Sequence, residues 1–161
     1  MTSPVLPITI RPLIANDLNF VYDTWLMSYR NTLMPEGGAR DKFYRMMRKR
    51  VSMLLLRGAK ALVAVDPSEP DYIYGFICAE ENLLHYVYVK DAYRGNGVSL
   101  QLTAEAGLGG ASPLFCTHWS TAFDRISIKK PGALRYIGTD VPAVMEGIDA
   151  IAGRTAVIAG S

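Results

Sequence analysis

Two glycines, Gly95 and Gly97, have the clearest chemical potential in the chain, because they lie between an apolar segment and a predicted helix. Segment 83–89 is aromatic and β-branched, which predicts a strand, and Val98 is the expected first helical residue. Glycine allows positive φ and close approach of a ligand to the backbone. The unpaired amides of a first helical turn, at the positive end of the helix dipole, attract anions. The turn therefore predicts a binding site for a pyrophosphate.

This turn differs from two common phosphate-binding motifs. The dinucleotide fingerprint needs a third glycine where Leu100 stands, and no Gly-Lys-Ser/Thr of a Walker loop follows. Residues 92–97 (Ala-Tyr-Arg-Gly-Asn-Gly) instead resemble motif A of the GNAT N-acetyltransferases, in which a strand ending in Val precedes Gln/Arg-x-x-Gly-x-Gly/Ala. Ala92 departs from the usual Gln or Arg. The alternative is an ordinary glycine-rich turn between a strand and a helix.

The resemblance implies an N-acyltransferase that uses acetyl-CoA as co-substrate and no metal. Val87 and Val89, at the strand end, would pair with the pantetheine and direct amides toward the thioester carbonyl. The charge of Arg94 adds to the anion site or faces solvent. The backbone amides implied for the pyrophosphate are those of Arg94, Gly95, Asn96, Gly97 and Val98.

The two histidines of the chain, His85 and His118, are the candidate general bases. In the GNAT family the strand of motif A and the strand after its helix part to form a V-shaped opening, and one histidine falls on each of these segments here. The pKa of imidazole suits proton transfer near neutral pH. A structural role is the alternative for each histidine. Glu80 and Glu81, in the preceding turn, are rival bases or solvated carboxylates.

Protonation of the leaving thiolate has no clear candidate. The tyrosine that often serves the family as general acid is absent from the predicted helix 120–128. Ser120 or Thr121 would donate to the thiol, or else cap this helix. The acceptor would lie near the first two helices, where the candidate residues are Trp25, Tyr29, Arg30 and Tyr44. Trp25 also fits a helix core position.

Hydrophobic periodicity and turn residues predict a β-α-α-β-β-β-α-β-α-β order over residues 7–138. The expected strands are 7–13, 60–65, 72–79, 83–89, 113–119 and 134–138, and the expected helices begin near 18, 40, 98 and 120. Alternation after Val98 by itself favours a strand, but helix-forming residues and the glycine turn favour a helix.

This order matches the GNAT layout, and segment 8–18 (Ile-x-Ile-Arg-Pro-Leu, then Asp-Leu) also resembles the start of many such domains. The resemblance implies a three-layer α+β fold: a mixed, mostly antiparallel central sheet with helices on both faces. We expect one domain over residues 1–161, with 139–161 as a C-terminal extension.

Composition narrows the class of protein. The chain has 161 residues, half of them hydrophobic, and a formal net charge of +2, which fits one folded domain. No apolar run reaches the roughly 18–20 residues that span a bilayer. Cys78 and Cys116 both lie in apolar segments, so a disulfide framework is not expected and a reducing, cytoplasmic location is. Small GNAT-like domains of this kind also occur in phage genomes.

The predicted helix 40–57 has one strongly basic face, with seven basic residues against Asp41. A solvated helix face is one interpretation, and a contact surface for nucleic acid is the other. The acceptor is therefore a small-molecule amine, a protein amine or a nucleic-acid-linked amine. A GNAT-fold binding module without catalysis is the competing hypothesis for function, and a homodimer is possible.

Overall fold

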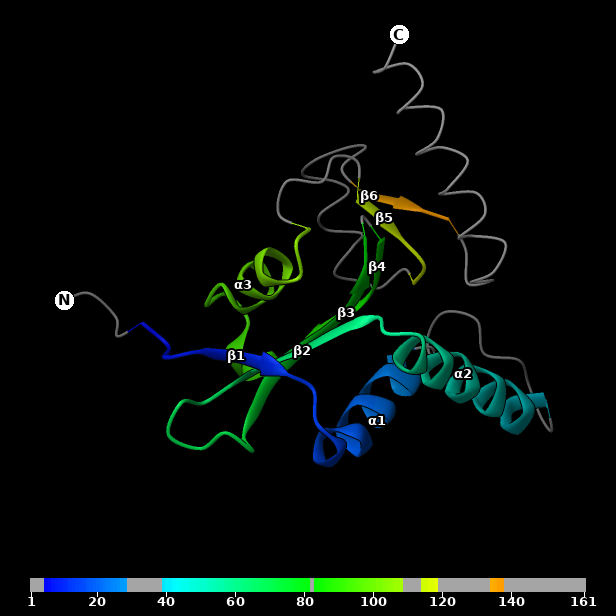
Figure 1. Cartoon of the computed structure of the whole chain (residues 1–161). Helices are drawn as coiled ribbons and strands as arrows, with labels where there is room; N and C mark the ends of the chain where they lie inside the picture. Colours follow the sequence, from blue (N-terminus) through cyan, green and yellow to red (C-terminus); the bar gives the residue numbers. More distant parts are fainter. Residues whose placement is uncertain (1–4, 29–38, 82, 109–113, 119–133, 138–161) are drawn as a thin grey trace, which may run out of the picture.

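The computed structural model describes residues 5–28, 39–81, 83–108, 114–118 and 134–137. Its six strands form one sheet in the order β1-β2-β3-β4-β5-β6 (Figure 1). The strands are β1 (Thr9–Pro12), β2 (Lys60–Val65), β3 (Ile73–Glu80), β4 (Leu83–Val89), β5 (Leu114–Cys116) and β6 (Leu134–Tyr136). The pairs from β1 to β4 are antiparallel, whereas β5 is parallel to both β4 and β6. The predicted mixed, mostly antiparallel sheet is confirmed.

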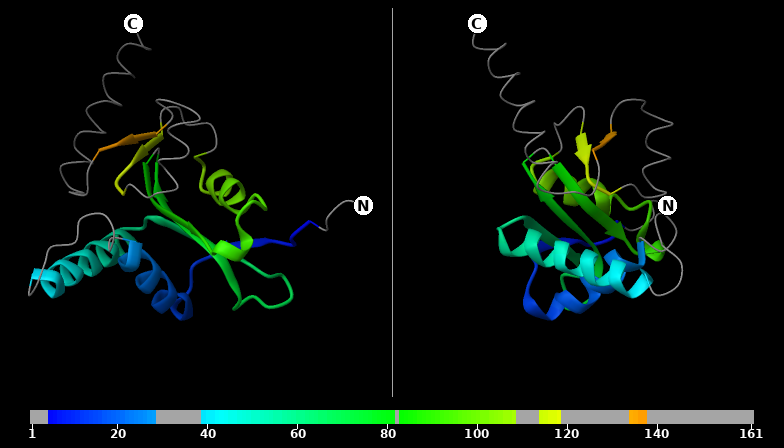
Figure 2. Two further views of the ribbon diagram at one scale, coloured as in Figure 1. Left: turned by 180° about the vertical axis from the view of Figure 1, so that it is seen from behind. Right: turned by 90° about the vertical axis from the view of Figure 1, so that its right-hand side faces the viewer.

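Helices cover both faces of this sheet (Figures 1 and 2). They are the 3₁₀ turns η1 (Ala15–Asp17) and η3 (Asp91–Tyr93) and the α-helices α1 (Leu18–Ser28), α2 (Ala39–Leu56) and α3 (Val98–Glu105). On one face, α1 and α2 form a core that includes Trp25, Val51 and Phe76. On the other face, α3 packs Leu102 against Ile77. Adjacent residues of β3 thus serve opposite cores, as the two-residue period of a strand requires.

Most predicted elements are present, and their ends differ by a few residues. Strands 60–65 and 83–89 have the predicted bounds, and the helix predicted from Val98 is confirmed. Of the strand predicted at 113–119, β5 covers Leu114–Cys116, and the prediction is wrong at residues 117–118, whereas positions 113 and 119 lie outside the described residues. β5 is short because β4 offers it pairing partners only at Leu83 and Leu84. The helix predicted at 120–128 lies outside the described residues.

A buried ion pair fixes the junction between β1 and α1. Arg11 donates two hydrogen bonds to Asp17, at 2.7 and 3.0 Å, and a third to the carbonyl of Pro70. Asp17 also accepts the backbone N–H of Ile14 and is only 3% exposed. Burial raises the pKa of Asp17, but the hydrogen bonds from Arg11 and Ile14 outweigh burial and leave the pKa below its usual value.

We expect Asp17→Asn to lower the free energy of unfolding by about 2 kcal/mol, because it removes the negative charge that accepts two hydrogen bonds from Arg11 and one from the Ile14 amide. Urea denaturation at pH 7 measures this loss. The difference from wild type should shrink as the pH falls through the native pKa of Asp17, since protonation then removes the same charge from the wild type. A difference that stays constant down to pH 2 would contradict the assignment.

Candidate functional site

The glycine turn forms an open backbone bend between η3 and α3. Gly95 and Gly97 have φ of 82° and 78°, and Gly97 is the N-cap residue of α3. A Cβ atom added to either glycine would meet no other atom within 4 Å, so the space beside the turn is open. Positive φ explains why glycine is needed at both positions. An open bend at the start of a helix suits a phosphate-bearing ligand, and the pyrophosphate site expected here stays a prediction.

The side chains of the turn are tied to the backbone around it. Arg94 pairs with Asp91 at 2.7 Å and donates from Nε to the carbonyl of Val89. Asn96 donates from its amide to the carbonyl of Tyr93. The Arg94 side chain remains 55% exposed, so its charge is available to an anion in the bend.

The described pairing between the parallel strands β4 and β5 involves only the start of β4. They pair only at Leu83 with Phe115 and at Leu84 with Cys116, followed by a bond from the Thr117 amide to the Leu84 carbonyl. From residue 85 to 89, β4 continues with no strand partner on this side among the described residues, although the Val89 carbonyl accepts from Arg94. Val87 and Val89 lie on this stretch and pair with β3 on the other side. The V-shaped opening implied by the family resemblance stays a prediction, because residues 119–133 lie outside the described part of the chain.

A bulge lies at the point where this described pairing ends. Cys78 on β3 pairs with Tyr86 and Ala79 pairs with Leu84, so His85 is an extra residue on β4 with no partner on β3. A bulge bends its strand and increases the local twist, and this one directly follows the last residue of β4 that pairs with β5. It also places His85 inside the protein, with no exposed surface.

Both ring nitrogens of His85 are engaged. Nδ1 lies 2.9 Å from Oγ1 of Thr117, and Nε2 lies 2.7 Å from Oε1 of Glu80, whose carboxylate also contacts Arg57. Burial lowers the pKa of His85, although Glu80 opposes this effect. Burial raises the pKa of Glu80, but the hydrogen bonds from Arg57 and His85 leave the pKa below its usual value. At neutral pH the pair is therefore a neutral imidazole beside an ionised carboxylate.

His118 lies beside the C-terminal end of α1. Its Nε2 is 2.8 Å from the hydroxyl of Ser28, which itself donates to the carbonyl of Trp25. The His118 ring packs 5.3 Å from the ring of Tyr86, and Tyr86 stacks on Trp25 at 5.4 Å. Burial lowers the pKa of His118 to about 4. The ring is therefore neutral, and it joins the end of α1 to the end of β5.

Of the remaining predicted site residues, one lies in the core and three lie outside the described part of the chain. Trp25 is 2% exposed and belongs to the core. Tyr29, Arg30 and Ser120 lie outside the described residues. Sequence reasoning missed Thr117 and Arg57. A hydroxyl one residue before His118 was the available signal for Thr117, but nothing in the sequence indicates that Arg57 reaches Glu80 across 23 residues.

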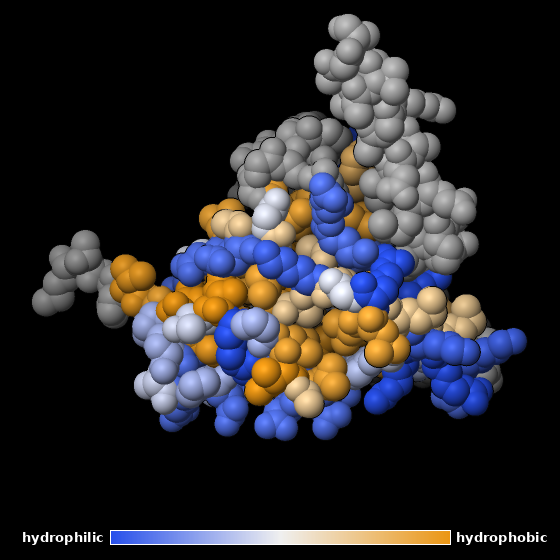
Figure 3. All heavy atoms as spheres, viewed as in Figure 1, coloured by the Kyte–Doolittle hydropathy of each residue, from blue (hydrophilic) through white to orange (hydrophobic). Residues whose placement is uncertain are grey.

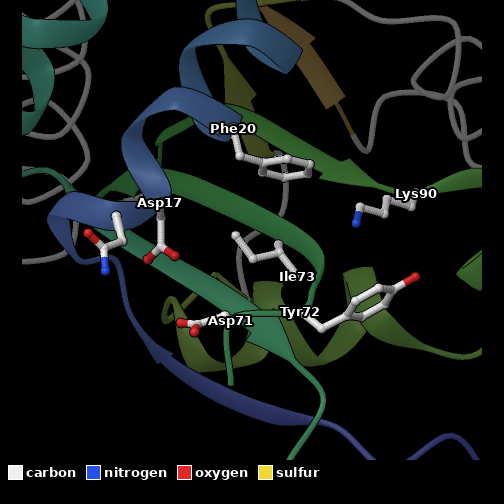
Figure 4. A pocket seen from close by; sticks show the side chains of 7 residues that line it. Asp17, Phe20, Asp71, Tyr72, Ile73 and Lys90 are labelled. Atoms are coloured by element: carbon white, nitrogen blue, oxygen red, sulfur yellow. The ribbon is translucent and has the colours of Figure 1, made fainter. Parts of the chain in front are cut away.

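A pocket of about 360 Å³ lies at the C-terminal end of β4, where Lys90 follows the strand (Figure 4). Its lining includes Asp71, Phe20, Tyr72 and Lys90, and the Lys90 ammonium lies 5.2 Å from the Phe20 ring centre and 4.6 Å from that of Tyr72. Lys90 is five residues after His85, about 16 Å along an extended strand. This pocket is therefore separate from the histidines.

The basic face predicted on residues 40–57 is partly used within the protein. Arg57 contacts Glu80, and the Arg48 guanidinium lies 4.6 Å from the ring centre of Tyr22. Lys42, Arg45 and Lys49 are on α2, where Figure 3 shows hydrophilic side chains gathered at the right of the molecule. A role of this face toward nucleic acid stays a prediction.

The residues that the structure describes give no support to a metal site, a cysteine nucleophile or a membrane-spanning helix. Those residues contain no cluster of three or more His, Cys, Asp or Glu side chains suited to a metal ion. Cys78 and Cys116 are buried free thiols, and burial raises the pKa of each to about 12, which makes them poor nucleophiles. Among the helices that the structure describes, none is both long and apolar enough to cross a bilayer.

Solved structures share this architecture. The sequence matches no protein-family model and no curated protein. A GCN5-related N-acetyltransferase from Rhodopseudomonas palustris superimposes with a TM-score of 0.52 at 17% identity, over 80% of this chain and 84% of that one. A protein described as histone acetyltransferase HPA2 and related acetyltransferase, from Corynebacterium glutamicum, gives 0.51 at 15% identity, over 76% and 83%. The chain has the fold of the GCN5-related (GNAT) N-acetyltransferases.

Proposed function

We propose that this protein is an N-acyltransferase that moves the acetyl group of acetyl-CoA to an amine by direct attack on the thioester. The observation that carries the proposal is the open glycine turn beside an unpaired stretch of β4. The amides around Gly95 and Gly97 suit the pyrophosphate, because they lie at the start of α3. The backbone of Val87 and Val89 suits the pantetheine, because no described strand pairs with it on the side away from β3 and only the Val89 carbonyl has a described acceptor role there, for Arg94.

The acceptor amine approaches β4 from the side of α1, behind which the buried rings of Trp25, Tyr86 and His118 pack together. A small-molecule amine and a protein amine both suit this route. Lys42, Arg45 and Lys49 on α2 would favour an acceptor attached to nucleic acid. Acetyl transfer to an amine panel with and without added DNA or RNA distinguishes these acceptors.

The test of the proposal is the affinity for acetyl-CoA, measured by calorimetry. We expect Gly97→Ala to weaken binding at least about tenfold, because a Cβ at positive φ costs about 1–2 kcal/mol and enters the space that the phosphates need. Gly107→Ala is the matched control. Gly107 has φ of 81° and equally open surroundings, but it lies past the other end of α3.

Equal loss of affinity in the two variants would contradict the proposed cradle, and absence of acetyl-CoA binding by the wild type would contradict the proposed function. Release of coenzyme A in the presence of amines then separates an enzyme from a binding module. Binding without release would favour the module.

A further inference from the structure

We propose that the Thr117 hydroxyl is the catalytic group that meets the reacting atoms, and that His85 and Glu80 act through it as a proton relay. This inference rests on the proposed acyl transfer. The sequence alone suggests His85 as a base that contacts the substrate. The structure excludes direct contact, because His85 has no exposed surface and both its ring nitrogens have protein partners.

The direction of each hydrogen bond follows from the charges. An ionised Glu80 can only accept, so the proton of the neutral ring is on Nε2. Nδ1 is then an acceptor, and at 2.9 Å it receives the hydroxyl proton of Thr117. A hydroxyl that donates to an imidazole, which in turn donates to a carboxylate, is the arrangement that activates a hydroxyl for proton transfer.

Thr117 is placed where this activation is useful. Its amide makes the last described bond between β5 and β4, to the carbonyl of Leu84, so Thr117 stands where the described pairing of the two strands ends, and 5% of the residue is exposed there. A thioester held along Val87 and Val89 has its reacting end toward this point. Burial lowers the pKa of His118 to about 4, which makes it the weaker candidate for a group that must take up a proton. The imidazolium of His85 would have Glu80 beside it.

The relay accounts for both proton transfers. As the amine nitrogen bonds to the acyl carbon, its proton passes to Oγ1 of Thr117, and the Thr117 proton passes to Nδ1 of His85. When the carbon–sulfur bond breaks, His85 returns its proton to Thr117, and Thr117 protonates the thiolate. The net change is one proton moved from the amine to coenzyme A, so no separate tyrosine acid is required.

Three groups and burial set the protonation of His85, and the groups come from different elements. Glu80 at the end of β3 favours the protonated ring, and Arg57 after α2 opposes it. Thr117 faces Nδ1, and burial disfavours the charge. We expect kcat of the wild type to fall at acid pH as His85 takes a proton before the reaction begins, since Nδ1 can then no longer accept.

The kinetic test compares Thr117→Val with Thr117→Ser in the full chain, using acetyl-CoA and a panel of primary amines. Thr117→Val keeps the shape but removes the hydroxyl, and we expect kcat to fall about 100-fold with acetyl-CoA affinity unchanged. Thr117→Ser should retain most of the activity. The acid limb of the kcat–pH profile should disappear in Thr117→Val. A Val variant as active as wild type would overturn the relay while leaving the proposed function intact.

A spectroscopic test does not depend on the acceptor. Ring ¹⁵N shifts of His85, assigned against His118→Gln, should show the Nε2–H tautomer, and Thr117→Val should shift the Nδ1 resonance alone. A proton on Nδ1 would overturn the relay even in an active enzyme. Lack of acetyl transfer by the wild type would overturn the proposed function and, with it, the catalytic role of Thr117.

Discussion

Gly75→Ala should lower the free energy of unfolding by at least about 3 kcal/mol, which corresponds to a fall of about 6–12 °C in Tm for a domain of this size. A Cβ at Gly75 would overlap the carbonyl oxygen of Tyr88 and also press on Val89. Both contacts are backbone atoms of β4, so no side chain can rotate away. The strands would have to move apart in the middle of the sheet.

Gly58→Ala is the control for this prediction. Gly58 has φ of 88°, but an added Cβ would meet no atom within 4 Å, so its substitution costs backbone strain alone, about 1–2 kcal/mol. Thermal denaturation of both variants separates steric overlap from strain. Equal losses at the two positions would contradict the close approach of β3 and β4 at Gly75.

Local sequence signals account for the elements that depend on neighbouring residues. Segment 83–89 is apolar and β-branched, and the structure gives β4 the same bounds. At 98–105 the apolar alternation favours a strand, yet the chain is helical, because Gly97 turns the backbone and α3 needs only Val98 and Leu102 to reach its core. The close approach of β4 to Gly75 likewise depends on a single residue type, because only glycine lacks the Cβ atom that would overlap Tyr88.

Features that depend on distant parts of the chain were not predictable. The sequence gives no sign that His85 occupies a bulge, because the bulge exists only relative to the register of β3. Its consequence is large: a histidine expected at the substrate becomes a buried residue that touches Thr117 and Glu80. The short extent of β5 likewise depends on where β4 bends. The sequence predicts which residues are candidates for the site, whereas the pairing of the strands decides which of their side-chain atoms are accessible.

The stability of the protein should fall as the pH drops from 6.5 to 4.5, and His118 should account for much of this fall. Burial holds the pKa of His118 at about 4, against 6.5 for the free side chain. At pH values between these two, His118 binds a proton in the unfolded chain but not in the native protein, so protonation favours unfolding. We expect a loss of about 2–3 kcal/mol over this range from His118, and His85, whose pKa burial also lowers, adds to it in the same direction.

Urea denaturation in half-unit pH steps measures this dependence, with His118→Gln as the comparison. Glutamine retains a donor for the Ser28 hydroxyl but does not titrate, so the variant should show a flatter profile from pH 6.5 to 4.5. This window separates histidines from carboxylates, because the pKa values of Glu80 and Asp17 are lowered and their effects belong to more acid pH. Parallel profiles for wild type and His118→Gln would show that His118 is hydrated in the folded protein, and the packing beside Tyr86 and Trp25 would then be open to water.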